Sequence, residues 1–92
     1  MDYLTATAEE IRRHLPREHR SGEPRLFLLY ALLARTKGLE TTAADVHDAW
    51  AAWKAIAGEQ HEAIVPFESL SREVQDQDLP FLHAIHQVAR TL

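Results

Sequence analysis

The sequence predicts an all-α fold, a small single domain over residues 1–92 built as a bundle of four main helices. Three observations support this prediction. Apolar residues recur at spacings of three and four, which is the period of a helix with one buried face. Proline, glycine, threonine and aspartate stand where helices would begin and end. No stretch alternates between apolar and polar residues in the manner of a half-buried strand.

The first predicted helix carries four apolar residues at spacings of four, three and four, which place them on one helical face. They are Leu4, Ala8, Ile11 and Leu15. Pro16 ends this helix, because proline disfavours a helical conformation of the residue before it. The polar stretch 17–23, which contains Ser21 and Gly22, is predicted to be a loop.

The second predicted helix has Pro24 in its first turn, Lys37 in its last turn and Gly38 just beyond. Its apolar residues cover two faces. One face carries Leu26, Leu29, Tyr30 and Leu33, and the other carries Leu28 and Leu32. A helix that is apolar nearly all round must be buried on more than one side. We favour a central position in the bundle, and the alternative is a homodimer in which Leu28 and Leu32 meet another chain.

The third predicted helix begins at Thr42, which with Asp45 resembles an N-cap pair, and it stops at Gly58. Its apolar stripe is Val46, Trp50, Trp53 and Ala57, flanked by Ala49 and Ile56. We expect Trp50 and Trp53 to pack in the core, which the helices close over. The alternative is that one of them lines a groove and stacks on an aromatic or adenine-like ligand.

Residues 59–69 contain Pro66 and are predicted to form an irregular connection before the last helix. Three apolar residues of this segment are available to lie across the core: Ile64, Val65 and Phe67. A short turn of helix is expected after Ser71. Asp78 then caps the last helix, which has Pro80 in its first turn. The buried stripe of that helix is expected to be Phe81, Ile85, Val88 and Leu92.

Composition excludes several classes of function. The chain has no cysteine, so it has no disulfides, Cys-ligated zinc or thiol nucleophile. No signal peptide is recognisable, and the longest apolar run, residues 26–34, is well short of the roughly 20 residues that span a bilayer. The net charge is -4, and the ten Lys and Arg residues are scattered. Without a basic stripe we expect no nucleic-acid partner, and we expect a cytoplasmic protein that does not enter membranes.

The six histidines are candidate metal ligands, because histidine is the commonest metal ligand in proteins. An adjacent His47-Asp48, with an earlier His and a later Asp, is the ligand order of metal-dependent HD phosphohydrolases. The residues that would complete it are His14 or His19 and Asp76 or Asp78. The spacing is unspecific, so the favoured interpretation is a histidine at the edge of the tryptophan stripe beside a solvated Asp48. His83 and His86 are expected to be exposed, because two nitrogens alone make an incomplete site. We therefore expect no catalytic residue, no metal and no cofactor.

Several motifs in the C-terminal half follow a recognisable order. They are Val46-His47-Asp48-Ala49-Trp50-Ala51-Ala52, His61, Ile64-Val65-Pro66-Phe67, Ser69-Leu70, and Asp76 with Asp78. Over residues 43–92 this order resembles the ryanodine-receptor (RyR) repeat domain in its short bacterial form. The resemblance implies a regulatory helical module that contacts a ligand or partner and performs no catalysis. It also implies a groove lined by His47, Trp50, His61, Pro66 and Phe67, for which packing and turn formation are the simpler roles.

The whole chain is also similar to short proteins of actinobacteria and their phages. The shared marks are Tyr-Ala-Leu-Leu at 30–33, Val-His-Asp-Ala-Trp at 46–50 and Pro-Phe-x-x-Leu at 66–70. This resemblance implies no particular activity. Taken together, these observations favour a non-enzymatic binding or adaptor protein. The alternatives are an HD-type phosphohydrolase and a phage or host inhibitor that occludes a protein partner.

Overall fold

The computed structural model describes all 92 residues and confirms an all-α fold without strands. Four helices of eleven to fourteen residues form the body, and a five-residue helix precedes the last of them. Single 3₁₀ turns lie in the connections. In chain order the elements are α1 (Tyr3–Arg13), η1 (Arg17–His19), α2 (Pro24–Thr36), η2 (Gly38–Glu40), α3 (Ala43–Ile56), η3 (Phe67–Ser69), α4 (Arg72–Asp76) and α5 (Leu79–Ala89).

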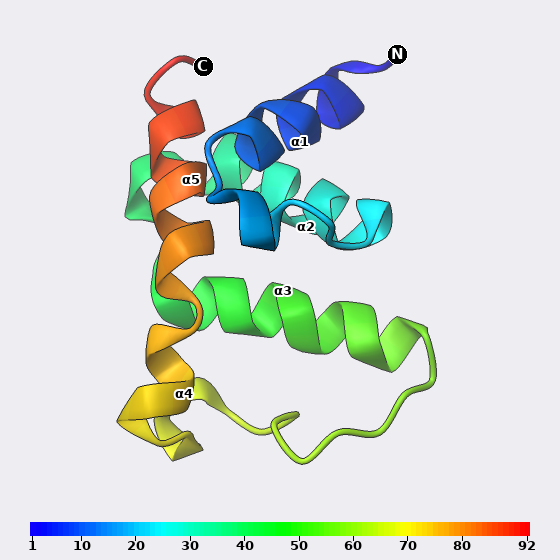
Figure 1. Cartoon of the computed structure of the whole chain (residues 1–92), viewed down its shortest axis with the longest axis vertical. Coiled ribbons are helices and arrows are strands. Elements are labelled where there is room, and N and C mark those ends of the chain that lie inside the picture. Colours follow the sequence, from blue (N-terminus) through cyan, green and yellow to red (C-terminus); the bar gives the residue numbers. More distant parts are fainter.

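Helix α2 occupies the centre, as the sequence predicted. It packs against α1, α3 and α5, and α5 runs across the ends of the other helices (Figure 1). Its innermost residues are Leu26, Phe27, Tyr30, Ala31 and Ala34. The second predicted stripe is not covered within the chain, since Leu28 and Leu32 are 38% and 48% exposed.

The hydrophobic core lies where α1, α2 and α5 meet the first turns of α3. Its largest fully buried side chains are Phe27, Ile11, Leu15, Ile85, Val46 and Val88. The predicted core around the two tryptophans is wrong in this respect, because Trp50 and Trp53 only pack against the edge of the cluster. Ile56, the last residue of α3, is 75% exposed. Ala57 is also exposed, and Leu92, which follows the end of α5, is exposed as well.

The predicted helix ends agree with the structure in most places. Thr42 and Asp45 form a reciprocal capping box at the start of α3, which satisfies free N–H groups of the first turn. Gly58 follows α3 with a φ of 73°, a conformation that favours glycine. Asp78 is the exception. It stands at the N-cap position of α5, but its side chain makes no capping hydrogen bond.

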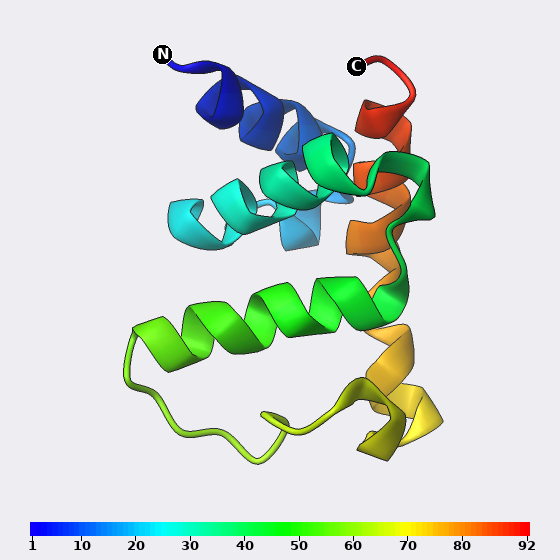
Figure 2. The same ribbon diagram turned by 180° about the vertical axis from the view of Figure 1, so that it is seen from behind.

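Two further predictions need correction. His83 is exposed, but His86 is partly buried and its Nε2 donates to the carbonyl oxygen of Thr41 at 2.8 Å. The irregular connection does not lie across the core. It passes beneath α3 in Figures 1 and 2, and Val65 is partly solvent-exposed. The connection therefore forms a wall on the side of α3 that faces away from α1 and α2 (Figure 2).

Candidate functional site

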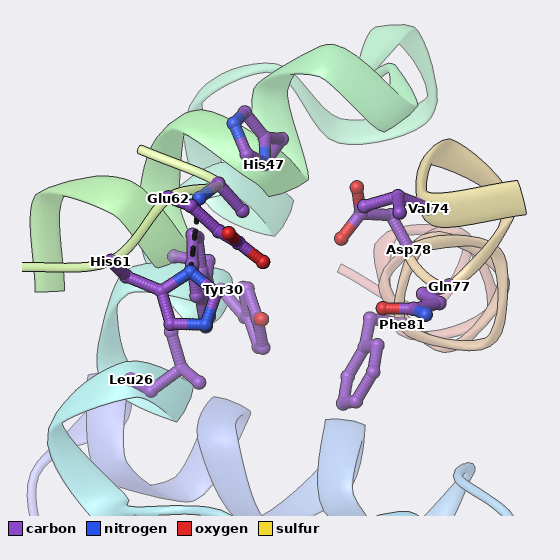
Figure 3. A pocket seen from close by; sticks show the side chains of 11 residues that line it. Leu26, Tyr30, His47, His61, Glu62, Val74, Gln77, Asp78 and Phe81 are labelled. Carbon is purple, nitrogen blue, oxygen red and sulfur yellow. Dashed lines mark hydrogen bonds between the residues drawn. The ribbon is translucent and has the colours of Figure 1, made fainter. Parts of the chain in front are cut away.

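A pocket of about 490 Å³ opens between α2, α3, the connection and the α4–α5 junction (Figure 3). This volume falls in the range of small-molecule sites. Eleven residues line it: Leu26, Tyr30, His47, Trp50, His61, Glu62, Ala63, Val74, Gln77, Asp78 and Phe81. Leu26, Tyr30 and His47 are buried, whereas His61, Glu62 and Gln77 are exposed. The pocket thus has a buried floor and a polar mouth.

His47 connects α3 to the wall below it. Its side chain is buried, and its Nε2 lies 2.7 Å from the carbonyl oxygen of Val65. A carbonyl only accepts hydrogen bonds, so Nε2 carries a proton and donates it to this bond. The imidazole also stacks on Trp50, with ring centroids 5.6 Å apart and planes at 28°. These contacts fix the orientation of both rings.

His61 holds the connection beside Trp50. Its Nδ1 accepts a hydrogen bond from the backbone N–H of Ala63 at 3.0 Å, shown as the dashed line in Figure 3. Its ring meets Trp50 edge to face, with centroids 5.2 Å apart and planes at 89°. This is a favoured geometry for aromatic pairs. An irregular segment is thereby ordered into one side of the pocket.

Asp78 supplies a carboxylate that points into the pocket from the α4–α5 junction (Figure 3). Burial raises its pKa to about 6, against the ordinary value of 3.8, and the opposing influence of nearby His47 is smaller. No hydrogen bond within the protein contributes to this shift. A half-buried carboxyl with a raised pKa in a cleft marks a candidate functional site.

Tyr30 brings a second polar group to the floor. The residue is 2% exposed, and its ring lies against Phe81 with centroids 5.6 Å apart. Burial and the negative charge of Asp78 raise the pKa of its hydroxyl, so it stays protonated at neutral pH. Its hydroxyl has no hydrogen-bond partner among the side-chain contacts of the protein, and it is not sealed from the pocket.

The five residues singled out from the sequence are partly brought together. His47, Trp50 and His61 line the pocket. Phe67 lies behind the wall, with its ring centroid 6.1 Å from that of His47, and Pro66 is exposed at the start of η3. Sequence reasoning missed Tyr30 and Phe81, which it assigned to helix packing, and it considered Asp78 only as a helix cap and as a metal ligand in the HD order.

The HD ligand order is not assembled in space. No group of three or more His, Asp or Glu side chains lies close enough to hold a metal ion. His47 is buried and bound to Val65, whereas the adjacent Asp48 is exposed. The two residues therefore face different surroundings.

A second, smaller pocket of about 240 Å³ lies beside Trp53 at the far end of α3. The indole Nε1 of Trp53 donates to a carboxylate oxygen of Glu23 at 3.3 Å, which links α3 to the start of α2. Each tryptophan thus borders a different pocket, so the two indoles can report on the two pockets separately.

The fold and the site define a small all-helical protein with one main aromatic-walled pocket. None of its helices has the length and hydrophobicity of a membrane span. The family model described as "Domain of unknown function (DUF7701)" matches residues 2–90. The chain belongs to this family. No curated protein and no solved structure matches the chain.

Proposed function

We propose that this protein is a non-enzymatic binding module whose main pocket receives a small ligand. The observation that carries the proposal is the combination of a buried floor with unpaired polar groups. Asp78 and the hydroxyl of Tyr30 face a cavity of about 490 Å³ without partners of their own. Neither group is sealed from the pocket, so a ligand that forms hydrogen bonds with them can gain affinity and orientation from both.

Binding is favoured over catalysis by the absence of a coupled pair. An activated nucleophile needs a base within hydrogen-bond reach, and the base needs an orienting group. Among the lining residues, the side-chain hydrogen bonds of His47 and His61 go to backbone groups. These histidines shape the walls. The same fact argues against the HD phosphohydrolase alternative, since His47 is committed to Val65.

The resemblance of residues 43–92 to the RyR repeat domain supports a regulatory version of this proposal. In that version a bound ligand changes the surface of the connection between α3 and η3, and a partner protein binds the changed surface. An inhibitor that occludes a partner is the remaining alternative. It would act through the outer surface and would not need the pocket.

Two single-tryptophan variants test the proposal. Trp53→Phe leaves Trp50 as the only indole, beside the main pocket, and Trp50→Phe leaves Trp53 beside the second pocket. Both would be titrated with adenosine, 2-phenylethanol, 2-phenylethylamine and 3-phenylpropionate. We expect saturable quenching of Trp50 by at least one compound and none of Trp53. Unsaturable or equal responses from both indoles would contradict a role for the main pocket.

The proposal also covers assembly and location. Leu28 and Leu32 lie one turn apart on α2 and are partly exposed, which supports a homodimer formed by this face with a second copy. Light scattering over a range of concentrations would test it, and a strict monomer would exclude it.

A cytoplasmic location is part of the proposal because a cysteine-free chain needs no oxidising compartment to fold. Cell fractionation would test this location.

A further inference from the structure

Apart from two histidines, the ionisable groups at the surface of the main pocket are acidic or phenolic. Two carboxylates line it, Glu62 at the mouth and Asp78 deeper in, and no lysine or arginine is among the lining residues. Lys54 is outside the lining set; its ammonium lies 5.9 Å from the Trp50 ring centroid and 5.0 Å from that of Trp53. The charge of Lys54 is balanced by an ion pair with Glu59. An anionic ligand would therefore meet repulsion in the pocket, and a cation would not.

The walls suit a cation as well. Trp50, Tyr30 and Phe81 present rings to the same cavity, and aromatic faces attract ammonium groups through their quadrupoles. The hydroxyl of Tyr30 is an acceptor without a partner in a residue that is 2% exposed. An ammonium has three N–H donors and no acceptor, so it can donate to a carboxylate and a phenol oxygen at once.

The size of the cavity further limits the class of ligand. A bare ammonium or a metal ion would leave most of about 490 Å³ unfilled. Leu26, Val74 and Phe81 line the remaining surface, and they favour an apolar body over a second polar group.

We infer that the main pocket binds a free arylalkylamine, with its ammonium beside Asp78 and Tyr30 and its aromatic ring against Trp50 and Phe81. This inference rests on the proposed function and names the ligand class for it. The carboxylate supplies the counter-charge and the buried hydroxyl a second acceptor. Glu62 at the mouth adds attraction during entry.

Three matched probes test the inference by isothermal titration calorimetry at pH 7.5: 2-phenylethylamine, 2-phenylethanol and 3-phenylpropionate. They share the phenyl ring and differ in charge. We expect the amine to bind at least about tenfold more tightly than the alcohol, and the acid to bind most weakly. Nα-acetyl-lysine methylamide is a fourth probe. If it binds more tightly than the aryl amine, the cation belongs to a partner protein and the inference is wrong.

Two variants locate the cation. Asp78→Asn keeps the shape of the side chain and removes its charge, and we expect the affinity for 2-phenylethylamine to fall about tenfold while that for the alcohol stays unchanged. Asp48→Asn is the matched control, because Asp48 is exposed and outside the pocket. We expect it to bind the amine as the parent protein does. Tyr30→Phe keeps the ring and should lower the affinity for 2-phenylethylamine less than Asp78→Asn does.

The failure of this inference is separable from the failure of the proposed function. Equal binding of amine and alcohol, or an unchanged amine affinity in Asp78→Asn, overturns the cation site and leaves the pocket a binding site. If none of the phenyl probes binds, the inference is also overturned. The titrations of the single-tryptophan variants with adenosine then decide the role of the pocket independently.

Discussion

The Nε2 atom of His47 donates a hydrogen bond to the carbonyl oxygen of Val65, 2.7 Å away and eighteen residues along the chain. This bond joins a helix of the bundle to a connection that has no regular structure of its own. The stacking of His47 on Trp50 and the edge-to-face contact of Trp50 with His61 continue the same link along the wall. One buried histidine thus joins two walls of the pocket; the sequence favoured it as a residue at the edge of the tryptophan stripe, with a metal ligand as the alternative.

His47→Ala is expected to destabilise the protein by about 2 kcal/mol, because it leaves a carbonyl without its donor and removes an aromatic contact. Urea unfolding would measure the change in free energy. Faster amide hydrogen exchange at Ala63 and Ile64 would show that the wall has loosened. His83→Ala on the exposed side of α5 is the control, and we expect almost no change there. Equal effects of the two variants would contradict the role of His47.

Asp78→Asn is expected to change how stability depends on pH. Because burial raises the pKa of Asp78 to about 6, the folded protein retains this proton at pH values where the unfolded chain has lost it. The stability of the parent protein should therefore fall by about 1 kcal/mol between pH 4 and pH 6, a figure that allows for solvent around a half-exposed group. Asp78→Asn should not show this fall in stability, and it should therefore be more stable than the parent protein at pH 7.

A comparison of the parent protein with Asp78→Asn isolates the contribution of Asp78 to the pH dependence of stability from that of neighbouring groups. His47 and Tyr30 face it from α3 and α2, and His61 and Glu62 share the pocket from the connection. These groups are present in both proteins. Thermal melts from pH 4 to pH 7 would supply the measurement. A difference that stays constant over this range would show that Asp78 titrates as an ordinary carboxyl.

Gly22→Ala is expected to cost about 1 to 3 kcal/mol through overpacking. A Cβ at this position would lie 2.5 Å from the ring of Phe27, which is 1% exposed in the centre of the core. The ring cannot move away easily, since the guanidinium of Arg12 covers it at 4.2 Å. Guanidinium unfolding would give the value. A variant as stable as the parent would mean that the loop shifts at no cost.

Thr42→Ala is expected to lower stability by about 1 kcal/mol, because it removes one half of the capping box with Asp45. Thr42→Ser keeps the hydroxyl and should retain most of the stability. Circular dichroism melts of the two variants would show the difference. If serine and alanine behaved alike, the hydroxyl would contribute nothing to the start of α3.

The helices were predictable from the sequence because their signals are local. The capping pair at Thr42, the glycine at 58 and the spacing of Leu4, Ala8, Ile11 and Leu15 each act within a few residues. The position of the core was less predictable. The helical period cannot tell which side chains of one apolar stripe meet a neighbouring helix: Val46 is fully buried, whereas the larger Trp50 and Trp53 are only partly buried.

The site was only half predictable for a related reason. Tyr30, His47, His61 and Asp78 come from four segments that converge only through tertiary packing. The position of Asp78 before a proline-containing helix indicates a cap, its place in the HD order indicates a metal ligand, and Tyr30 follows the apolar pattern of α2. Its polar hydroxyl on an otherwise apolar face was the one signal available, since buried hydroxyls usually need partners.

The most direct test of the cation site is the titration of the Asp78 carboxyl, followed by ¹³C NMR with and without saturating 2-phenylethylamine. The midpoint should lie near pH 6 in the free protein, as burial requires, and should fall when the ammonium is bound, because a positive charge favours the carboxylate. A midpoint near the ordinary value of 3.8 that the amine leaves unchanged would contradict both the buried carboxylate and its role in binding.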